Sequence, residues 1–217
     1  MKETKSIINN ILSNIKYNEI KCPVCESLLY NPKTEYCYNC EKKLKKKMLD
    51  IERLGGELAY INFTLDKYEM SEQIKEKIKE YPGKNLYIWG DVGTGKTHLA
   101  TALVRQFDDG LVIKIQQIFR EIRNNLDIEN VIINKYVNKN YLVIDDIGVE
   151  KTTDFNFNIL YEIIDRRYMK MKKGLIITSN LSLDKLAEKL GDDRIPSRIA
   201  GMSVIIKLEG RDRRLIK

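Results

Sequence analysis

The sequence contains no run of about 20 apolar residues, which is the length that a membrane-spanning helix requires. Its opening stretch, MKETKSIINNILSNIKYNEIK, is too polar for a secretory signal peptide and lacks a small-residue cleavage site. Cysteine is missing everywhere except between residues 22 and 40, and histidine occurs only once. These absences argue against membrane and secreted proteins and predict a cytoplasmic protein, in which thiols stay reduced.

The composition is that of a folded, basic protein. With 217 residues, of which 43% are apolar, the chain can form one ordinary domain and a small appendage. Lysine and arginine exceed the acidic residues, for a formal charge of +7. This balance suits nucleic acid or an acidic partner, although a basic chain alone is weak evidence for either.

All the cysteines belong to two Cys-x-x-Cys pairs, which are Cys22 with Cys25 and Cys37 with Cys40. Two such pairs can place four thiolates around one zinc ion. Two disulfides are the alternative, and a reducing compartment disfavours them. A redox pair fits poorly, because two matched pairs are typical of structural sites. Since four protein ligands leave no position open for a substrate, we expect zinc to stabilise a small binding module.

A helix is expected before the cysteines, and a lysine-rich stretch follows them. Residues 4–17 carry an isoleucine-rich stripe, which either packs on the zinc module or docks into a partner protein. The lysine-rich stretch EKKLKKKMLD is either a solvated helix or linker or a phosphate-binding segment. The glycines of LGGEL then break the pattern. We therefore predict an N-terminal module with a basic linker at 1–53 and a second domain at 54–217.

The stretch LYIWGDVGTGKTHLA matches the phosphate-binding loop pattern G-x-x-x-x-G-K-[ST] between an apolar strand and a helix. Backbone N–H groups and the helix N-terminus would bind phosphates, Lys96 would reach the β- and γ-phosphates, and the Thr97 hydroxyl would hold Mg²⁺. His98 is expected mainly to pack on the helix. The predicted ATP-binding residues are Gly90, Asp91, Val92, Gly93, Thr94, Gly95, Lys96, Thr97 and His98.

Polar residues follow two further apolar runs. Tyr141–Ile144 is a predicted strand that ends in Asp145, expected to hold Mg²⁺ through its water shell, and in Asp146, expected to activate the attacking water. In KGLIITSNLS, Asn180 would lie beside the γ-phosphate. With strands at 111–115 and 203–208, the chain predicts an α/β fold with a five-stranded parallel sheet flanked by helices and a nucleotide at the strand ends.

Two arginines in GDDRIPSRIAG, Arg194 and Arg198, precede the last strand. Either could reach the γ-phosphate of a neighbouring subunit as an arginine finger, and surface salt bridges are the alternative. Pro196 disfavours a regular helix interior between them, so the sequence leaves open which arginine projects.

Residues 61 to 217 resemble the AAA+ ATPases of the DnaC/DnaI-type replicative helicase loaders. Five stretches carry the resemblance, in this order: GDVGTGKTHLA, LVIDDIGVE, LYEIIDRRY, IITSNLS and DRIPSRIAG. The IstB transposition helper is similar over the same stretch. The resemblance implies ATP, Mg²⁺ and Zn²⁺ as cofactors, self-association through the AAA+ domain, and loading of a hexameric replicative helicase onto single-stranded DNA. It also implies that the N-terminal zinc module contacts the helicase. The compact module suggests a phage or mobile-element version.

The resemblance also suggests roles for single residues. Arg198 matches the arginine finger, Arg194 a companion, and Asn180 the sensor at the end of the fourth strand. Asp146 stands where many AAA+ proteins have glutamate, which predicts slow hydrolysis. We expect no helical lid after the last strand, and Arg211, Arg213 or Arg214 could partly replace the arginine that a lid supplies. Expected DNA contacts on and near QQIFREIRNN are Lys114, Arg120, Arg123 and Phe119, the last of which is equally suited to the core.

Two other functions stay open at this point. An IstB-like transposition ATPase would need a transposase partner and would bind duplex DNA. A zinc-ribbon DNA-binding module could use ATP only as a regulatory ligand, and its function would then survive the loss of the Asp146 carboxylate.

Overall fold

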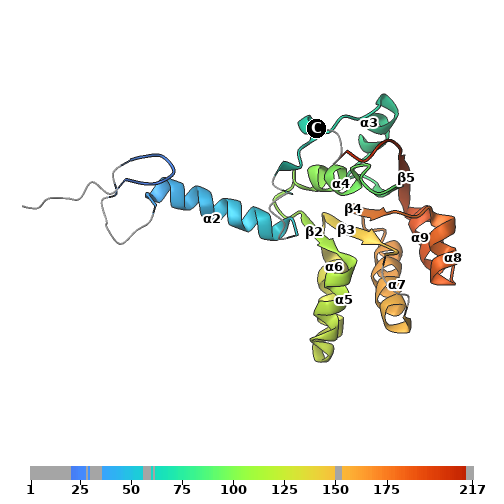
Figure 1. The fold of residues 1–217 in the computed structure, drawn as a ribbon. Coiled ribbons are helices and arrows are strands. Elements are labelled where there is room, and N and C mark those ends of the chain that lie inside the picture. Colours follow the sequence, from blue (N-terminus) through green and yellow to red (C-terminus); the bar gives the residue numbers. More distant parts are fainter. Residues whose placement is uncertain are drawn as a thin grey trace, which may run out of the picture. The chain divides into compact units, whose positions relative to one another are not determined.

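A computed structural model describes residues 21–27, 29, 36–55, 60, 62–149 and 153–213. Contacts within the chain divide it into two units, Met1–Leu49 and Asp50–Lys217. Figure 1 shows the ribbon and labels the elements. The helix predicted at 4–17 lies outside the described residues.

The first unit contains the four cysteines and most of helix α2 (Tyr38–Arg53). The lysine-rich stretch is therefore helical, as one of its interpretations predicted. Its five lysines are exposed, and the carboxylate of Glu41 pairs with Lys45 one turn later at 2.7 Å. The apolar side chains of Met48 and Leu49 are also about two-thirds exposed. The end of this unit thus presents mainly solvated lysine side chains.

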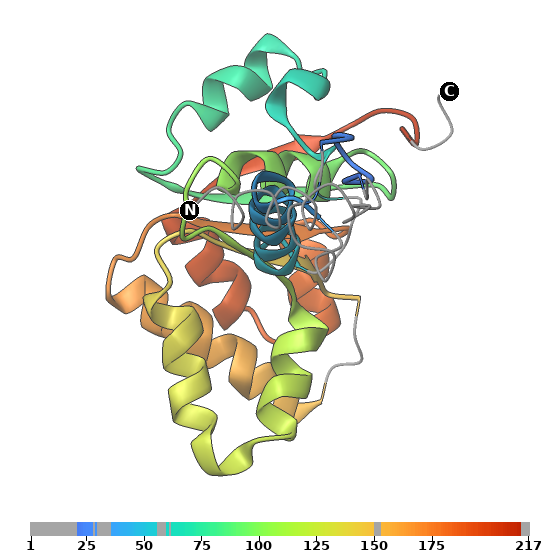
Figure 2. The ribbon, with the colours of Figure 1, turned by 90° about the vertical axis from the view of Figure 1, so that its left-hand side faces the viewer.

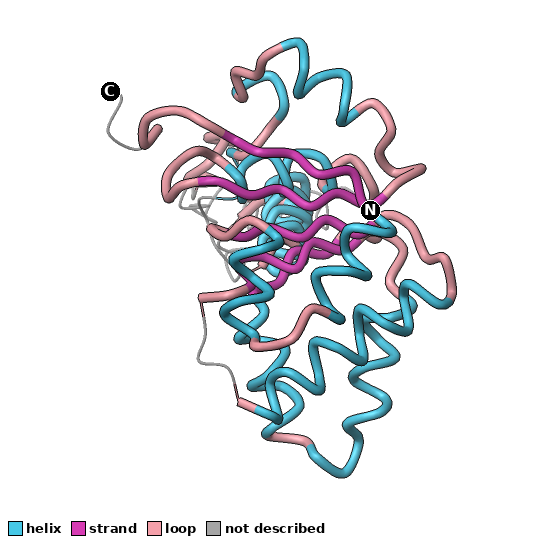
Figure 3. Tube along the Cα trace, turned by 90° about the vertical axis from the view of Figure 1, so that its right-hand side faces the viewer, coloured by secondary structure: helices cyan, strands magenta, loops and turns pink. Residues whose placement is uncertain are grey.

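The second unit is built on a five-stranded parallel sheet, as predicted, with the strand order β2-β3-β4-β1-β5. Figure 3 shows the strands side by side in magenta. Residues in the centres of the three inner strands β1, β3 and β4 are buried, which explains the near-continuous apolar runs of these strands in the sequence. The edge strands β2 and β5 are only partly buried. All the carboxyl ends of the strands meet at one edge of the sheet. The strands are β1 (Asn85–Gly90), β2 (Leu111–Lys114), β3 (Leu142–Ile147), β4 (Leu175–Ser179) and β5 (Ser203–Leu208).

Helices cover both faces of the sheet (Figure 2). On one face, Leu86 and Ile88 of β1 pack in a cluster with α4 residues such as Leu99; on the other, Tyr87 packs in a cluster with Ile118 of α5. This alternation along β1 follows from the two-residue period of a strand. The helical elements are η2 (Leu65–Lys67), α3 (Glu72–Ile78), α4 (Lys96–Val104), α5 (Ile115–Arg123), η3 (Leu126–Ile128), α6 (Glu129–Asn138), α7 (Asp154–Met169), α8 (Leu183–Leu190) and α9 (Arg194–Met202).

Two local expectations need correction. Pro196 does not interrupt a helix, because it lies in the first turn of α9, where a backbone N–H has no intrahelical partner to lose. The strand expected to end at Ile144 continues through Asp145 and Asp146 to Ile147. Its pairing with β4 shifts register between Ile144 and Ile147. Asp145 and Asp146 therefore lie within a bulge of the strand and not after its end.

A buried arginine joins α6 to the loop before β4. Arg167 is fully buried, and its guanidinium donates hydrogen bonds to the carbonyls of Tyr136, Val137 and Lys139 at the end of α6, at 2.8–3.0 Å. A further hydrogen bond reaches the Lys173 carbonyl at 3.2 Å. Burial lowers the pKa of Arg167 to about 10, so the group stays charged at neutral pH. It therefore satisfies carbonyls that the end of a helix leaves unpaired.

None of the helices in the described ranges combines the length and apolar character that a membrane crossing demands.

Candidate nucleotide site and cysteine cluster

The phosphate-binding loop connects β1 to α4 and depends on glycine at two positions. Gly90 has φ +147°, and a Cβ there would lie 2.1 Å from the Leu208 carbonyl oxygen of the neighbouring strand. Gly95 precedes the first residue of α4 with φ +92°, a conformation that side chains disfavour. The glycines thus let the loop turn tightly and bring the α4 N-terminus to the end of the sheet.

The ammonium group of Lys96 lies inside this loop. Its Nζ donates to the carbonyl oxygens of Gly90 at 2.8 Å and Asp91 at 2.7 Å, and the residue is only 7% exposed. A buried cation surrounded by backbone dipoles at a helix N-terminus is suited to an anionic ligand. Lys96 is therefore positioned where the sequence pattern expects it to meet phosphate.

Thr97 and Asp145 lie next to each other at the ends of α4 and β3. The Thr97 hydroxyl donates to the Asp145 carboxylate at 2.9 Å, and the Thr178 hydroxyl donates to the same oxygen at 2.6 Å. Burial raises the pKa of Asp145, and these two hydrogen bonds oppose the rise. One hydroxyl and one carboxylate in contact form a donor set of the kind that Mg²⁺ takes beside a nucleotide, so the residues fit the predicted ion.

Asp146 occupies the bulge of β3 with φ +64°. The Thr178 hydroxyl accepts a hydrogen bond from its backbone N–H at 2.8 Å, and Asn180 Nδ2 lies 3.4 Å from its carboxylate. Thr178 therefore contacts both aspartates and fixes the bulge. This geometry brings Asp146 and Asn180 together at the end of two adjacent strands, as their positions in the sequence suggest.

A cleft of about 570 Å³ contains these groups. Two of its aromatic residues, Tyr60 and Phe63, were not predicted, because the stretch before β1 carries no motif that marks them. Arg213, one of the three suggested arginines, also lines it, and its backbone N–H donates to the Gly93 carbonyl at 3.0 Å. Arg214 lies outside the described residues. The cleft is lined by Tyr60, Phe63, Val92, Gly93, Gly95, Lys96, Thr97, His98, Lys114, Asp145, Asp146, Asn180 and Arg213.

His98 both packs and lines the cleft. Its ring stacks on Phe63 with centroids 4.4 Å apart, and Nε2 lies 3.1 Å from the Thr64 carbonyl oxygen. Burial lowers the pKa of His98, which favours the neutral ring. Together with Tyr60 and Phe63 it forms an aromatic wall that can accept a flat apolar group such as a nucleobase.

Both candidate finger arginines project from α9 and have partners within the chain. Arg198 pairs with Asp165 and donates to the Tyr161 hydroxyl at 2.9 Å. Arg194 pairs with Asp192 at 2.8 Å and lies 4.8 Å from the centre of the Tyr161 ring. The Arg194 side chain is 53% exposed and that of Arg198 is 25% exposed. The structure thus places both arginines in salt bridges, with Arg194 the more accessible.

The four candidate DNA-contacting residues do not form one surface. Phe119 is 3% exposed and belongs to the core, which favours its core alternative over stacking on a base. Lys114 ends β2 and lines the nucleotide cleft. Arg120 and Arg123 are exposed on α5, and Arg123 lies 5.4 Å from the centre of the Phe155 ring.

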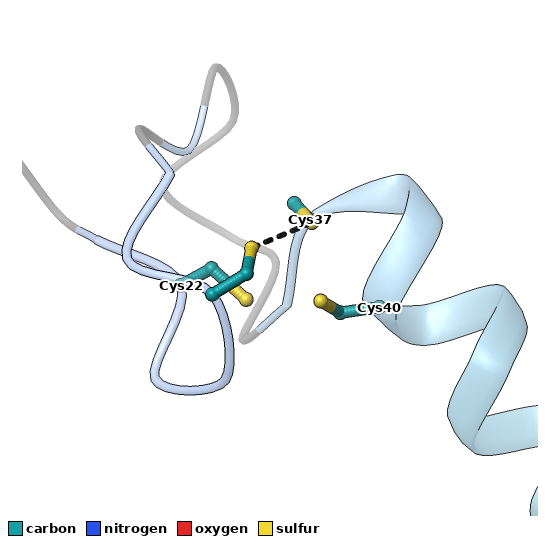
Figure 4. A group of neighbouring side chains, drawn as sticks. Cys22, Cys37 and Cys40 are labelled. Atoms are coloured by element: carbon teal, nitrogen blue, oxygen red, sulfur yellow. Dashed lines mark hydrogen bonds between the residues drawn. The ribbon is translucent and has the colours of Figure 1, made fainter.

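The four cysteines gather in the first unit, and Figure 4 labels Cys22, Cys37 and Cys40 among them. Their sulfur atoms all lie within 4.8 Å of one another, and those of Cys25 and Cys37 are 3.5 Å apart. Tetrahedral zinc–thiolate bonds of about 2.3 Å correspond to sulfur separations of about 3.8 Å. The donor set therefore fits a zinc ion, and Cys37 and Cys40 enter it from the start of α2.

The fold and the site define a phosphate-binding-loop protein with an AAA+-like architecture. A family model described as "IstB-like ATP binding protein" matches residues 76–215, which is more than half of the chain. The chain belongs to this family.

Individual relatives point to helicase loaders. The replicative helicase loader DnaI of Bacillus subtilis (strain 168) is 23% identical over 232 residues, covering 97% of this chain and 72% of DnaI. The replicative helicase loader DnaC of Buchnera aphidicola is 28% identical and covers 74% of each chain. A crystal structure of the DnaC helicase loader aligns with a TM-score of 0.61 and 26% identity, covering 70% of this chain and 100% of that one.

Proposed function

We propose that this protein is an ATP-dependent loader of a hexameric replicative helicase onto single-stranded DNA, acting in the cytoplasm. The observation that carries this proposal is the extent of the similarity to DnaI. It covers 97% of the chain, whereas the IstB-like family match begins only at residue 76. The N-terminal module is thus part of what this chain shares with a helicase loader. A phage or mobile-element origin is a prediction that the neighbouring genes would test.

The nucleotide site would bind ATP with Mg²⁺. Lys96 would exchange its two backbone carbonyl partners for the β- and γ-phosphates, and Thr97 and Asp145 would hold the ion and its water shell. Asp146 would orient the attacking water with Asn180 beside the γ-phosphate. The aromatic wall of Tyr60, Phe63 and His98 would take the base. When bound, Mg²⁺ neutralises charge that develops on the phosphates.

Self-association would complete this site. Arg198 of one subunit would approach the γ-phosphate of the next, with Arg194 as its companion. To do so, Arg198 must leave Asp165 and Tyr161, which hold it in this structure. Binding of ATP by a neighbour supplies the negative charge that would compete with Asp165.

The cysteine module would bind zinc through Cys22, Cys25, Cys37 and Cys40 and would contact the helicase. Zinc closes a small unit that has too few apolar residues to fold firmly by itself. The neighbouring lysines of α2 are exposed and could meet an acidic partner or a phosphate backbone. Single-stranded DNA would be bound by the AAA+ domain, with Arg120 and Arg123 as the exposed candidates on α5.

Hydrolysis would be slow, so that ATP serves as a switch. Asp146 has a shorter side chain than glutamate and sits in a strained conformation, and it therefore positions water less well. We expect a kcat for the free protein below about 1 s⁻¹. Asp146→Asn should bind ATP like the parent and hydrolyse it far more slowly, and Asp146→Glu tests side-chain length. A zinc-ribbon protein that uses ATP only as a ligand would keep all function, including partner release, in Asp146→Asn.

A second candidate is an IstB-like transposition helper, which the family match at residues 76–215 favours. Such a protein would bind duplex DNA and a transposase. A transposase gene beside this one would favour the second candidate, and replication genes would favour the loader.

The deciding experiment is to mix the purified protein with its host's replicative helicase, with and without ATP, and to weigh the complexes by native mass spectrometry. A discrete complex with the helicase hexamer, lost when residues 1–50 are deleted but retained in Lys96→Ala without nucleotide, supports the loader and the role of the N-terminal module. Absence of a complex under every nucleotide condition would overturn the loader proposal, and transposase would be tested next.

A further inference from the structure

An exposed apolar and acidic surface lies at the turn between α5 and α6, here called the tip (residues 126–131). Leu126, Ile128 and Val131 are 57%, 49% and 65% exposed. Asp127 and Glu129 alternate with them. Three large apolar side chains that are about half or more exposed within six residues mark a surface that a partner could cover.

The acidic groups of the tip have no cationic partner in the part of the chain that the structure describes. The nearest basic residues in the sequence are occupied elsewhere: Lys135 pairs with Glu121 at 2.7 Å, and Arg123 lies over the Phe155 ring. The tip therefore presents apolar side chains together with negative charge.

A second surface has the complementary character. A cleft of about 630 Å³, here called the Met/Lys cleft, lies between the end of α7, the loop before β4 and the junction of α9 with β5. Its most exposed apolar residues are Tyr168, Met169 and Met171, at 41%, 71% and 81%. Methionine side chains adapt to apolar groups of many shapes. The lining residues are Lys84, Asn85, Arg167, Tyr168, Met169, Met171, Lys172, Lys173, Gly201, Met202, Ser203 and Val204.

The charge of the Met/Lys cleft is entirely positive, because its lining contains three lysines and Arg167 but no acidic residue. Lys84 is neutralised by Glu80. Lys172 donates only to the neutral Asn140 side chain at 2.7 Å, and Lys173 is exposed. The cleft thus offers two uncompensated ammonium groups beside methionines.

We propose that the tip of one copy of this chain docks into the Met/Lys cleft of another copy. Leu126, Ile128 and Val131 would be covered by the methionines and Tyr168, while Asp127 and Glu129 would pair with Lys172 and Lys173. A nucleic acid backbone would use the lysines but would leave the methionines without an apolar partner, which is why a protein segment of this composition fits better.

The tip cannot reach the cleft of its own chain. Arg166 of α7 donates to Asn130 and Asn134 of α6 at 3.3 and 3.2 Å, and Lys170 donates to Asn138 at 3.0 Å. These contacts hold α6 along α7. At 1.5 Å per residue, the helix from Val131 to Asn138 keeps the tip about 10 Å from the end of α6 beside the cleft.

Two different surfaces on each copy make the contact head-to-tail, so it can add further copies rather than close a dimer. The cleft lies where β1 and β5 begin, whereas the nucleotide site lies where the strands end. The contact therefore uses neither Arg198 nor ATP, and it does not depend on the loading role.

Charge reversal and sedimentation velocity test the proposal. The full chain without nucleotide should associate as its concentration rises, less so at high salt. Asp127→Lys with Glu129→Lys, or Lys172→Glu with Lys173→Glu, should each weaken association at least about tenfold, because like charges then face each other. The quadruple variant should associate again, since the reversed tip fits the reversed cleft.

Two matched controls carry the same charge changes elsewhere, Asp184→Lys with Glu188→Lys on α8 and Lys43→Glu with Lys46→Glu on α2. Both should associate like the parent, and thermal melts should show that every variant is folded. A parent that stays monomeric at all concentrations overturns the proposal, as does a quadruple variant that fails to recover. Loss of association in the cleft variant but not in the tip variant would also overturn it, because another segment would then fill the cleft.

Discussion

The Thr97 hydroxyl and the Asp145 carboxylate, 48 residues apart in the sequence, are joined by a hydrogen bond of 2.9 Å. The first residue of this pair belongs to the helix after the phosphate-binding loop, and the second to β3, an interior strand of the sheet. Because each side chain is held by its own element, the pair would be preorganised for the proposed Mg²⁺ before a nucleotide binds.

The first prediction concerns the Thr97 hydroxyl. Without Mg²⁺, Thr97→Ala should bind ATP almost as tightly as the parent. The increase in ATP affinity that Mg²⁺ causes should be at least about tenfold smaller in this variant, since a hydrogen bond to a charged group contributes about 1.5–3 kcal/mol. Thr97→Ser retains the hydroxyl and should behave like the parent. Titration of a fluorescent ATP analogue with Mg²⁺ and with chelator measures the difference. Equal Mg²⁺ dependence in the alanine variant would contradict the role.

The second prediction follows from the buried carboxyl of Asp145. Since burial raises its pKa in the folded protein, the neutral form favours folding and this contribution is lost as pH rises through the raised pKa. Asp145→Asn should therefore stabilise the free protein at pH 7.5 on the order of 1 kcal/mol, or about 2–4 °C in a chain of this size.

The advantage of Asp145→Asn should shrink as pH falls below the raised pKa. Thermal melts of the parent and the variant in chelator, at pH 7.5 and at the lowest pH at which both stay folded, measure it. Mg²⁺-dependent ATP binding should fall at the same time. The opposite result would be a stability of Asp145→Asn, relative to the parent, that is lower at pH 7.5 than at acidic pH. It would show that the hydrogen bonds from Thr97 and Thr178 outweigh the effect of burial on the pKa of Asp145.

The third prediction concerns the buried guanidinium of Arg167. Arg167→Met should destabilise the chain by about 3 kcal/mol or more, because each buried carbonyl left without a donor costs about 1–3 kcal/mol. Arg167→Lys keeps the charge but cannot reach four carbonyls, and it should be intermediate. The neighbouring Arg166→Met serves as the control, since Arg166 has only partly exposed partners. Urea denaturation of all three variants gives the free energies, and similar losses at 166 and 167 would refute the assignment.

The fourth prediction concerns metal content. The purified protein should hold one zinc ion per chain, and Cys37→Ser should lose most of it because a hydroxyl does not replace a thiolate ligand. Ser27→Ala is the matched control: it removes the contact of 3.0 Å between Ser27 and Cys25 but keeps all four thiols. Plasma mass spectrometry of the dialysed proteins gives the ratio, and full zinc occupancy in Cys37→Ser would contradict the four-thiol site.

The nucleotide site was largely predictable because its signals are local. The spacing from Gly90 to Thr97 and the paired aspartates after an apolar run predict where these residues lie, because parallel strands bring them to one edge of the sheet. Asn180 follows from the same rule, since β4 lies beside β3. Lys96 is therefore found inside the loop without any knowledge of tertiary contacts.

Other features depend on contacts that leave no local pattern. Arg166 and Arg167 are adjacent in a helix, and only the packing of α6 shows that one is buried and the other is not. Phe63 reaches His98 across 35 residues of sequence, and its stretch lacks a motif. The position of Phe119 in the sequence suits either the core or stacking on a base, so its burial could be decided only in three dimensions.

The contact between Gly90 and Leu208 affects how variants of this protein should be chosen. The space at position 90 is closed by backbone, which cannot move aside as a side chain can. Any substitution there would push β5 away from β1 whether or not a nucleotide is present. A Gly90 variant would therefore report damage to the sheet as if it were loss of ATP binding, whereas Lys96→Ala removes the ammonium group expected to contact phosphate and should leave the strands in register.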